Sequence, residues 1–130
     1  MDTTPEALRA RLAALIEAPP PPRLLVRPDP PDPGIAEAPF QALVVDVARW
    51  LGWLVYHPYD SRRSARGFPD LTLVRRAPPY TLVMAELKTE RGRLTTEQCE
   101  WATALLRAGV RYHLWRPSNW HDILETLTAG

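Results

Sequence analysis

The chain has 130 residues, enough for one domain with a sizeable hydrophobic core, and its formal net charge of +1 does not by itself indicate a nucleic-acid-binding protein. It contains no apolar run of about 18 residues that would span a membrane, and its first residues do not resemble a signal peptide, so we expect a cytoplasmic protein. The single cysteine excludes an internal disulfide, and three scattered histidines argue against a structural zinc site.

The first 36 residues predict a helical arm followed by a linker. Thr4 is a favourable helix cap and Pro5 suits the first helical position. The helix carries one apolar stripe, formed by Leu8, Leu12, Leu15 and Ile16. Eight of the fifteen prolines fall between Pro19 and Pro33, which predicts an arm over residues 1–18 and a semi-rigid linker over residues 19–36. The linker is alternatively a proline-rich ligand for a partner domain. The arm packs on a second subunit, on a larger assembly or on its own domain.

A domain is predicted over residues 37–130, and it begins with a helix from Glu37 to the breaker Gly52. Apolar residues recur in this helix at helical spacing, namely Phe40, Leu43, Val44, Val47, Ala48 and Leu51. Residues 53–57 predict a strand, and an arginine-rich loop over residues 58–67 follows it. From its position alone, Glu37 is a first-turn acid that the helix dipole favours.

Residues 70–76 and 80–88 predict two antiparallel strands joined at a tight connection around Pro78. A turn centred on Pro78 pairs residues whose numbers sum to 156, so Asp70 lies opposite Glu86 on one face. Two opposed carboxylates repel each other unless a cation neutralises them, and Lys88 follows Glu86 on the same face. A register shifted by one residue would instead separate the two acids and leave an ordinary strand end.

Lys88 is the single lysine beside fifteen arginines. A lysine ammonium is compact and its pKa responds to its surroundings, which suits the positioning of a water near a reacting centre. Chance retention of one surface lysine is the alternative. The two nearby acids favour the chemical interpretation.

The remaining residues predict a helix, a strand and a last helix. Thr95 and Gln98 have capping-box spacing at the start of the helix, which ends at Gly109. Residues 110–115 predict the fourth strand, and Ser118 is expected to cap the last helix. The expected architecture is therefore α/β, with a mixed four-stranded sheet flanked by helices.

Three motifs together resemble the PD-(D/E)xK nuclease superfamily, and specifically its virus-type replication-repair nuclease (VRR-NUC) branch. They are Gly67-Phe68-Pro69-Asp70, Ala85-Glu86-Leu87-Lys88 and Thr95-Thr96-Glu97-Gln98-Cys99-Glu100-Trp101, and the resemblance covers roughly residues 37–128. It implies a restriction-endonuclease-like αβββαβ core. It also implies that Mg²⁺ or Mn²⁺ is bound by Asp70, Glu86, the Leu87 carbonyl and Glu37, that Lys88 helps to activate the attacking water, and that Gln98 belongs to the site.

Basic residues are concentrated around the expected site, with eight basic and three acidic residues between Arg62 and Arg93. We expect DNA contacts from Arg62, Arg63, Ser64, Arg66, Arg91 and Arg93. The expected activity is that of a metal-dependent DNA endonuclease in repair, recombination or replication, homodimeric and selective for branched DNA such as Holliday junctions, without a small-molecule cofactor. Cutting directed at nicks, flaps or single strands is equally compatible with the residues. A non-catalytic nucleic-acid-binding module with the same fold is the alternative, and an enzyme acting on another substrate is a third possibility.

Overall fold

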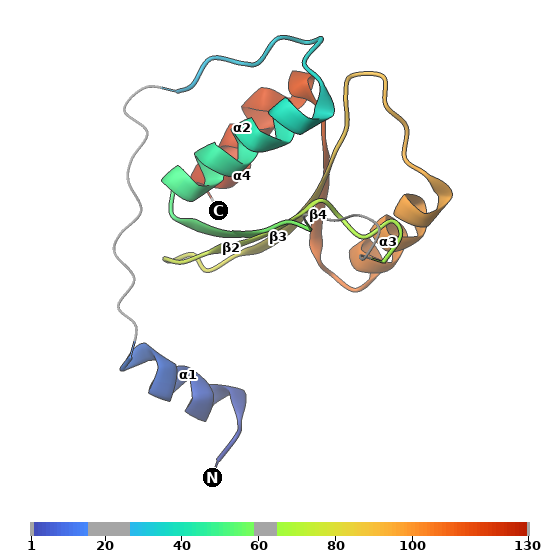
Figure 1. Cartoon of the computed structure of the whole chain (residues 1–130). Coiled ribbons are helices and arrows are strands. Elements are labelled where there is room, and N and C mark those ends of the chain that lie inside the picture. The colour runs from blue at the N-terminus through green and yellow to red at the C-terminus, as the bar shows by residue number, and fades with distance from the viewer. Residues whose placement is uncertain (1, 16–26, 59–64, 130) are drawn as a thin grey trace.

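The computed structural model describes residues 2–15, 27–58 and 65–129, which form a four-stranded sheet and its helices (Figure 1). The elements follow in the order α1 (Pro5–Ala13), α2 (Glu37–Trp50), β1 (Trp53–Tyr56), β2 (Leu71–Arg75), β3 (Leu82–Leu87), α3 (Thr96–Arg107), β4 (Arg111–Trp115), a 3-10 turn (Pro117–Asn119) and α4 (Trp120–Ala129). Helices α2 and α4 cover one face of the sheet, and α3 lies on the other side beside β4 (Figure 1). From α2 to β4 the order is αβββαβ, so the predicted α/β core is confirmed.

The sheet has the strand order β1-β2-β3-β4, in which the first three strands are antiparallel and β4 runs parallel to β3. Leu71 pairs with Ala85 and Val74 pairs with Leu82. These partners have numbers that sum to 156, which confirms the predicted register. The parallel pair β3-β4 is joined through α3, as a parallel connection requires.

The strands are shorter than predicted, and both ends of the hairpin differ from expectation. Asp70 lies just before β2, and Lys88 lies just after β3. The ladder ends here because the amide of Leu87 donates to the side chain of Asp70, with 2.8 Å between N and Oδ2, and not to a backbone carbonyl. Lys88 instead donates its amide to the carbonyl of Trp115 in β4, at 3.0 Å.

The remaining differences lie at strand and helix ends. The predicted strands included His57, Arg76, Tyr80, Thr81 and Val110, all of which lie outside the observed strands.

Ser118 does not cap the last helix as predicted, because it lies within the 3-10 turn that precedes α4. The backbone amide of Ser118 donates to the carboxylate of Glu90, and the Asn119 side chain accepts from the amide of Arg116 at 2.8 Å. These bonds tie the turn to the loop after β3 and to the end of β4.

The hydrophobic core lies between the sheet and the pair α2 and α4. Alternate residues of β1 and β2, such as Trp53, Leu71 and Leu73, point into it and are almost completely buried. The indole Nε1 of Trp53 donates to the carbonyl of Leu127 in α4, at 2.9 Å, so the one polar atom of this ring is satisfied inside the core. This packing holds the start of α2 at one end of the sheet.

The N-terminal helix has the predicted cap, since the Thr4 hydroxyl accepts from the amide of Ala7 at 3.2 Å. No residue of α1 is buried, and Leu8, Leu12 and Leu15 of its apolar stripe are exposed. Ile16 and most of the proline-rich stretch lie outside the described residues. Among the described helices, none is long and apolar enough to cross a membrane.

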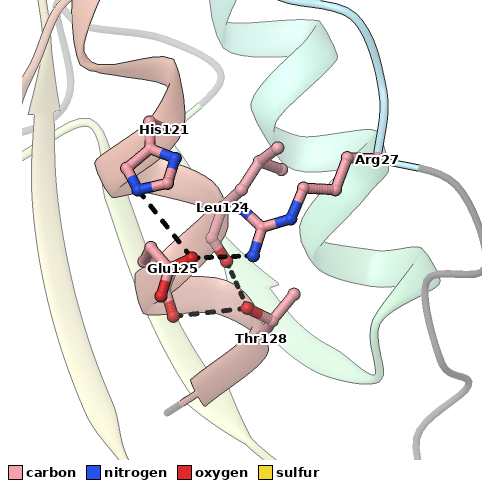
Figure 2. A network of polar contacts seen from close by, with 5 residues as sticks. All are labelled: Arg27, His121, Leu124, Glu125 and Thr128. Carbon is pink, nitrogen blue, oxygen red and sulfur yellow. Dashed lines mark hydrogen bonds and ion pairs between the residues drawn. The ribbon is translucent and has the colours of Figure 1, made fainter.

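Residues that precede α2 contact α4 (Figure 2). Arg27 forms an ion pair with Glu125, with 2.7 Å between Nη2 and Oε1, and His121 stands on the other side of the same carboxylate. The carbonyl of Pro28 accepts from the indole Nε1 of Trp120, at 2.9 Å. The described part of the stretch before α2 is therefore attached to the domain at its first two residues. The predicted boundaries of arm, linker and domain stay predictions.

Candidate metal centre

Three carboxylates from three separate segments converge at one end of the sheet. Glu37 is the first residue of α2, Asp70 precedes β2, and Glu86 lies in β3. One oxygen of each lies within 4.8 Å of the others. Burial and the charge of Asp70 raise the pKa values of Glu37 and Glu86, and Lys88 lies close enough that its charge partly opposes this rise. The structure therefore brings together the three acids and the lysine that the sequence singled out.

Asp70 is held in place by a hydrogen bond from the backbone and by the packing of the loop that precedes it. Its carboxylate accepts the Leu87 amide at 2.8 Å. The preceding Gly67 has a φ of +83° and lies against the first turn of α3, where a Cβ would be only 2.3 Å from the carbonyl carbon of Glu97. Only glycine allows this conformation together with so close an approach. The loop that carries Asp70 is thus packed onto α3.

Trp101 of α3 reinforces this attachment. Its indole Nε1 donates to the carbonyl of Arg66 at 3.1 Å, and its ring meets Phe68 edge to face with 5.1 Å between the ring centroids. The Trp101 ring therefore packs against the loop that carries Asp70. Through these contacts α3 fixes the position of the Gly-Phe-Pro-Asp motif.

Glu86 is the most unusual group in the site, because its side chain is only 1% exposed. Its Oε1 accepts from the Nε2 of Gln98 at 2.8 Å, whereas its Oε2 is buried without a hydrogen-bond partner. Burial and the charge of Asp70 raise the pKa of Glu86 from 4.5 to about 8, and Lys88 opposes the rise. A buried carboxylate oxygen without a partner is costly, and a bound cation would satisfy it.

Gln98 both completes the cap of α3 and contacts Glu86. The Oε1 of Gln98 accepts from the backbone amide of Thr95 at 2.8 Å, and the backbone amide of Gln98 donates to the Thr95 hydroxyl at 3.1 Å. These two bonds complete the capping box. The Nε2 of Gln98 is then free to point to Glu86. One carboxamide serves both purposes because it has an acceptor at one atom and a donor at the other.

Glu37 faces an open hollow of about 430 Å³ that runs along α2. Burial and the charge of Asp70 raise its pKa above the ordinary value. The hollow is lined by Glu37, Ala38, Gln41, Ala42, Val45, Asp46, Arg49, His57 and Asp70. Glu37 is therefore part of the acidic cluster as well as a first-turn acid of α2.

The residues predicted to contact DNA are only partly described. Arg66, Arg91 and Arg93 are exposed on the loops next to the carboxylates. Arg62, Arg63 and Ser64 lie outside the described residues. Contact of these six residues with DNA stays a prediction.

Sequence reasoning missed Arg116. This residue follows β4, and its guanidinium donates to three carbonyls of the loop after Lys88. Nothing local in the sequence distinguishes it from the other fourteen arginines. Only the packing of β4 beside β3 brings it to this loop.

The carboxylate cluster offers only oxygen atoms, and these are the ligands that Mg²⁺, Mn²⁺ and Ca²⁺ prefer. The unpartnered Oε2 of Glu86 and the proximity of Glu37 and Asp70 fit such a cation. Soft metals that prefer thiolate are not favoured, because Cys99 is exposed on α3 and is not part of the cluster.

A model of the VRR-NUC domain family matches residues 42–118, which is more than half of the chain. The chain belongs to the VRR-NUC family. The match includes Asp70, Glu86, Lys88 and Gln98 and begins after Glu37. The family is of the nuclease type, and the acidic cluster of this VRR-NUC domain fits a metal site.

A solved structure described as a VRR-NUC domain has the same fold, with a TM-score of 0.56 and 21% sequence identity. The alignment covers 68% of this chain and 94% of the other. No curated protein matches the chain. At this identity the solved structure supports the fold, and the family membership rests on the sequence model.

Proposed function

We propose that this VRR-NUC domain is a metal-dependent DNA endonuclease that hydrolyses phosphodiester bonds. The observation that carries the proposal is the unpartnered, buried Oε2 of Glu86 in a cluster whose carboxylate oxygens lie within 4.8 Å of one another. Such an arrangement is unfavourable for three acids by themselves and favourable around a divalent cation. Lys88 beside the cluster supplies a group that a purely structural cation site does not need.

The proposed cation is Mg²⁺ or Mn²⁺, held by Asp70, Glu86, the carbonyl of Leu87 and Glu37. When bound, the cation polarises the phosphate and lowers the pKa of a water. Lys88 orients that water and stabilises the negative charge that develops on the phosphate. Gln98 keeps Glu86 in place through the 2.8 Å hydrogen bond, so that the carboxylate does not rotate away from the cation.

DNA is the proposed substrate, and we favour branched or otherwise structured DNA such as a four-way junction. Arg66, Arg91 and Arg93 are exposed beside the site and supply positive charge for phosphates, as Arg62 and Arg63 also would, and the hydroxyl of Ser64 would donate a hydrogen bond. No base-reading module is apparent in the sequence, which favours recognition of DNA shape over recognition of a base sequence. The proposed setting is repair, recombination or replication.

We also propose that the domain forms a homodimer through the sheet face that α3 leaves uncovered. Leu54, Val74 and Leu82 are direct partners across β1, β2 and β3, and all three are exposed. This row is uncharged, which suits a second protein copy better than DNA. Strand alternation places Glu86 on the same face. A symmetric dimer would contain two metal centres, one for each strand of a branched DNA.

Cleavage of labelled DNA tests the activity. The purified chain is incubated with four-way junction, flap, duplex and single-stranded DNA in Mg²⁺, Mn²⁺ or EDTA. We expect cutting that needs the metal and that is lost in Asp70→Ala, with a loss of at least about a hundredfold in Lys88→Ala. Glu100→Ala, an exposed position on α3, is the matched control and should cut normally.

Each result has a defined meaning. Activity retained in both Asp70→Ala and Lys88→Ala would refute the assigned site. Binding without cutting by the wild-type chain would favour the non-catalytic binding module. For the dimer, sedimentation should show that Leu54→Asp converts a dimer into a monomer, and a wild-type monomer would refute the proposed interface.

A further inference from the structure

The guanidinium of Arg116 is directed at the protein's own backbone. Its Nη1 donates to the carbonyl of Thr89 at 2.7 Å, to that of Gly92 at 2.7 Å, and more weakly to that of Glu90 at 3.2 Å. The side chain is half-buried. Three carbonyls of one short loop thus converge on one charged donor, and hydrogen bonds of this kind are stronger than those between neutral groups. A DNA phosphate would have to compete with these contacts.

The loop that Arg116 holds lies close to the side chain of Lys88. The amide of Gly92 donates back to the carbonyl of Thr89 at 3.2 Å, which closes the loop into a turn. A Cβ on Gly92 would lie 3.4 Å from both Cβ and Cδ of Lys88 and 3.1 Å from Oγ1 of Thr89. The turn at Gly92 therefore lies near the aliphatic part of the lysine side chain, where an added Cβ would just reach van der Waals contact.

Two further contacts join the same parts of the molecule. The carboxylate of Glu90 accepts from the backbone amide of Ser118, and the amide of Lys88 donates to the carbonyl of Trp115 at 3.0 Å. The loop after Lys88 is therefore bonded to the end of β4 in three ways. The amide of Lys88 donates to Trp115, three loop carbonyls accept from Arg116, and the Glu90 carboxylate accepts from Ser118. Arg116 makes the largest number of these bonds among the described residues.

We propose that Arg116 is a positioning residue for Lys88. It fixes the turn from Thr89 to Gly92, and this turn directs the ammonium of Lys88 toward Asp70 and Glu86. Its benefit for cleavage rests on the proposed nuclease function, whereas the positioning itself is a property of the folded chain. The two statements are therefore tested by separate measurements.

The single lysine allows a direct test of the positioning. In protein labelled with ¹³C at the lysine ε-carbon, one side-chain signal reports on Lys88. We expect Arg116→Gln to shift this signal and to increase the mobility measured by its relaxation. Arg107→Gln, at an exposed position near the end of α3, should leave the signal unchanged. Arg116→Lys keeps the charge but not the planar fork, so it should give an intermediate result.

The indole N–H signals of Trp53 and Trp120 report whether each variant is folded, because both donors are hydrogen-bonded inside the domain. If Arg116→Gln does not fold, the result for Arg116→Lys decides. A folded variant in which the Lys88 signal and its mobility equal those of the wild type would overturn the proposal, whether or not the chain cuts DNA.

Cleavage kinetics test the consequence for the reaction. In Arg116→Gln we expect kcat to fall about tenfold to a hundredfold, while KM for DNA stays within about twofold, because a misdirected catalytic group slows the chemical step. Millimolar guanidinium chloride should restore part of kcat, and equal concentrations of urea or NaCl should not. An unchanged kcat, or a loss that appears only in KM, would contradict the proposed role. Absence of cutting by the wild type would refute the nuclease function and leave the NMR result valid.

Discussion

Replacement of Glu86 by glutamine should change how the stability of the metal-free protein depends on pH. The pKa of Glu86 is raised from 4.5 to about 8 by burial and by the charge of Asp70. Between these two pH values the folded chain keeps a proton that the unfolded chain has released. The free energy of unfolding therefore falls as pH rises through this interval.

The size of the effect follows from the shift. One proton gives a slope of at most about 1.4 kcal/mol per pH unit. We expect a total loss on the order of 3 kcal/mol between about pH 5 and about pH 8 for the wild type. Glutamine resembles the protonated glutamate, because it is uncharged and its Oε1 can still accept from Gln98. Glu86→Gln should thus match the wild type near pH 5 and exceed it by about that amount near pH 8.

Urea denaturation in EDTA, repeated across this pH range, measures both curves. Glu100→Gln, an exposed control on α3, should follow the wild type at every pH. Addition of Mg²⁺ should stabilise the wild type more at high pH than at low pH, because the ligand carboxylates must lose their protons to bind it, and it should have little effect on Glu86→Gln. A wild-type stability that is flat or rises with pH in EDTA, or a variant that runs parallel to it, would refute this account of Glu86.

Two further substitutions test how α3 supports the site. Gly67→Ala should lower the free energy of unfolding by at least about 2 kcal/mol, because φ at this position is +83° and the new Cβ would lie 2.3 Å from the carbonyl carbon of Glu97. Urea denaturation measures the change. A variant as stable as the wild type would contradict so close a contact between this loop and α3. Thr95→Ala should cost about 1 kcal/mol through the lost cap, whereas Gln98→Ala also leaves Oε1 of Glu86 without its donor and should cost more and slow cleavage. Equal losses in stability and activity for the two variants would show that the bond from Gln98 to Glu86 has no role of its own.

The features that the sequence predicted well depend on interactions over a few residues. Thr4 and Thr95 cap their helices through hydrogen bonds to residues three positions away. The hairpin register followed from the position of Pro78 in a short connection, and the observed pairs have the expected sum. A short turn leaves few ways to align two strands, so the alignment of Asp70 with Glu86 could be predicted from the sequence.

The ends of helices and strands were harder to predict from the sequence, because contacts between distant residues decide where they lie. Asp70 lies outside β2 since its side chain takes the Leu87 amide that a strand partner would otherwise have taken. Ser118 lies in a 3-10 turn whose backbone is bonded to Glu90, 28 residues earlier. Local propensity contains no information about either partner.

By itself, the sequence determined the α/β element order, the register of the central hairpin and the family, and through the family it indicated Glu37 and Gln98 as site residues. The tertiary structure decided that Glu37 meets Asp70 and Glu86 within 4.8 Å, that Gln98 caps α3 and binds Glu86 at the same time, and that Arg116 holds the loop beside Lys88. Patterns along a chain specify backbone conformation over a few residues. The approach of side chains from distant segments depends on how the helices pack on the sheet, and only the folded chain contains that information.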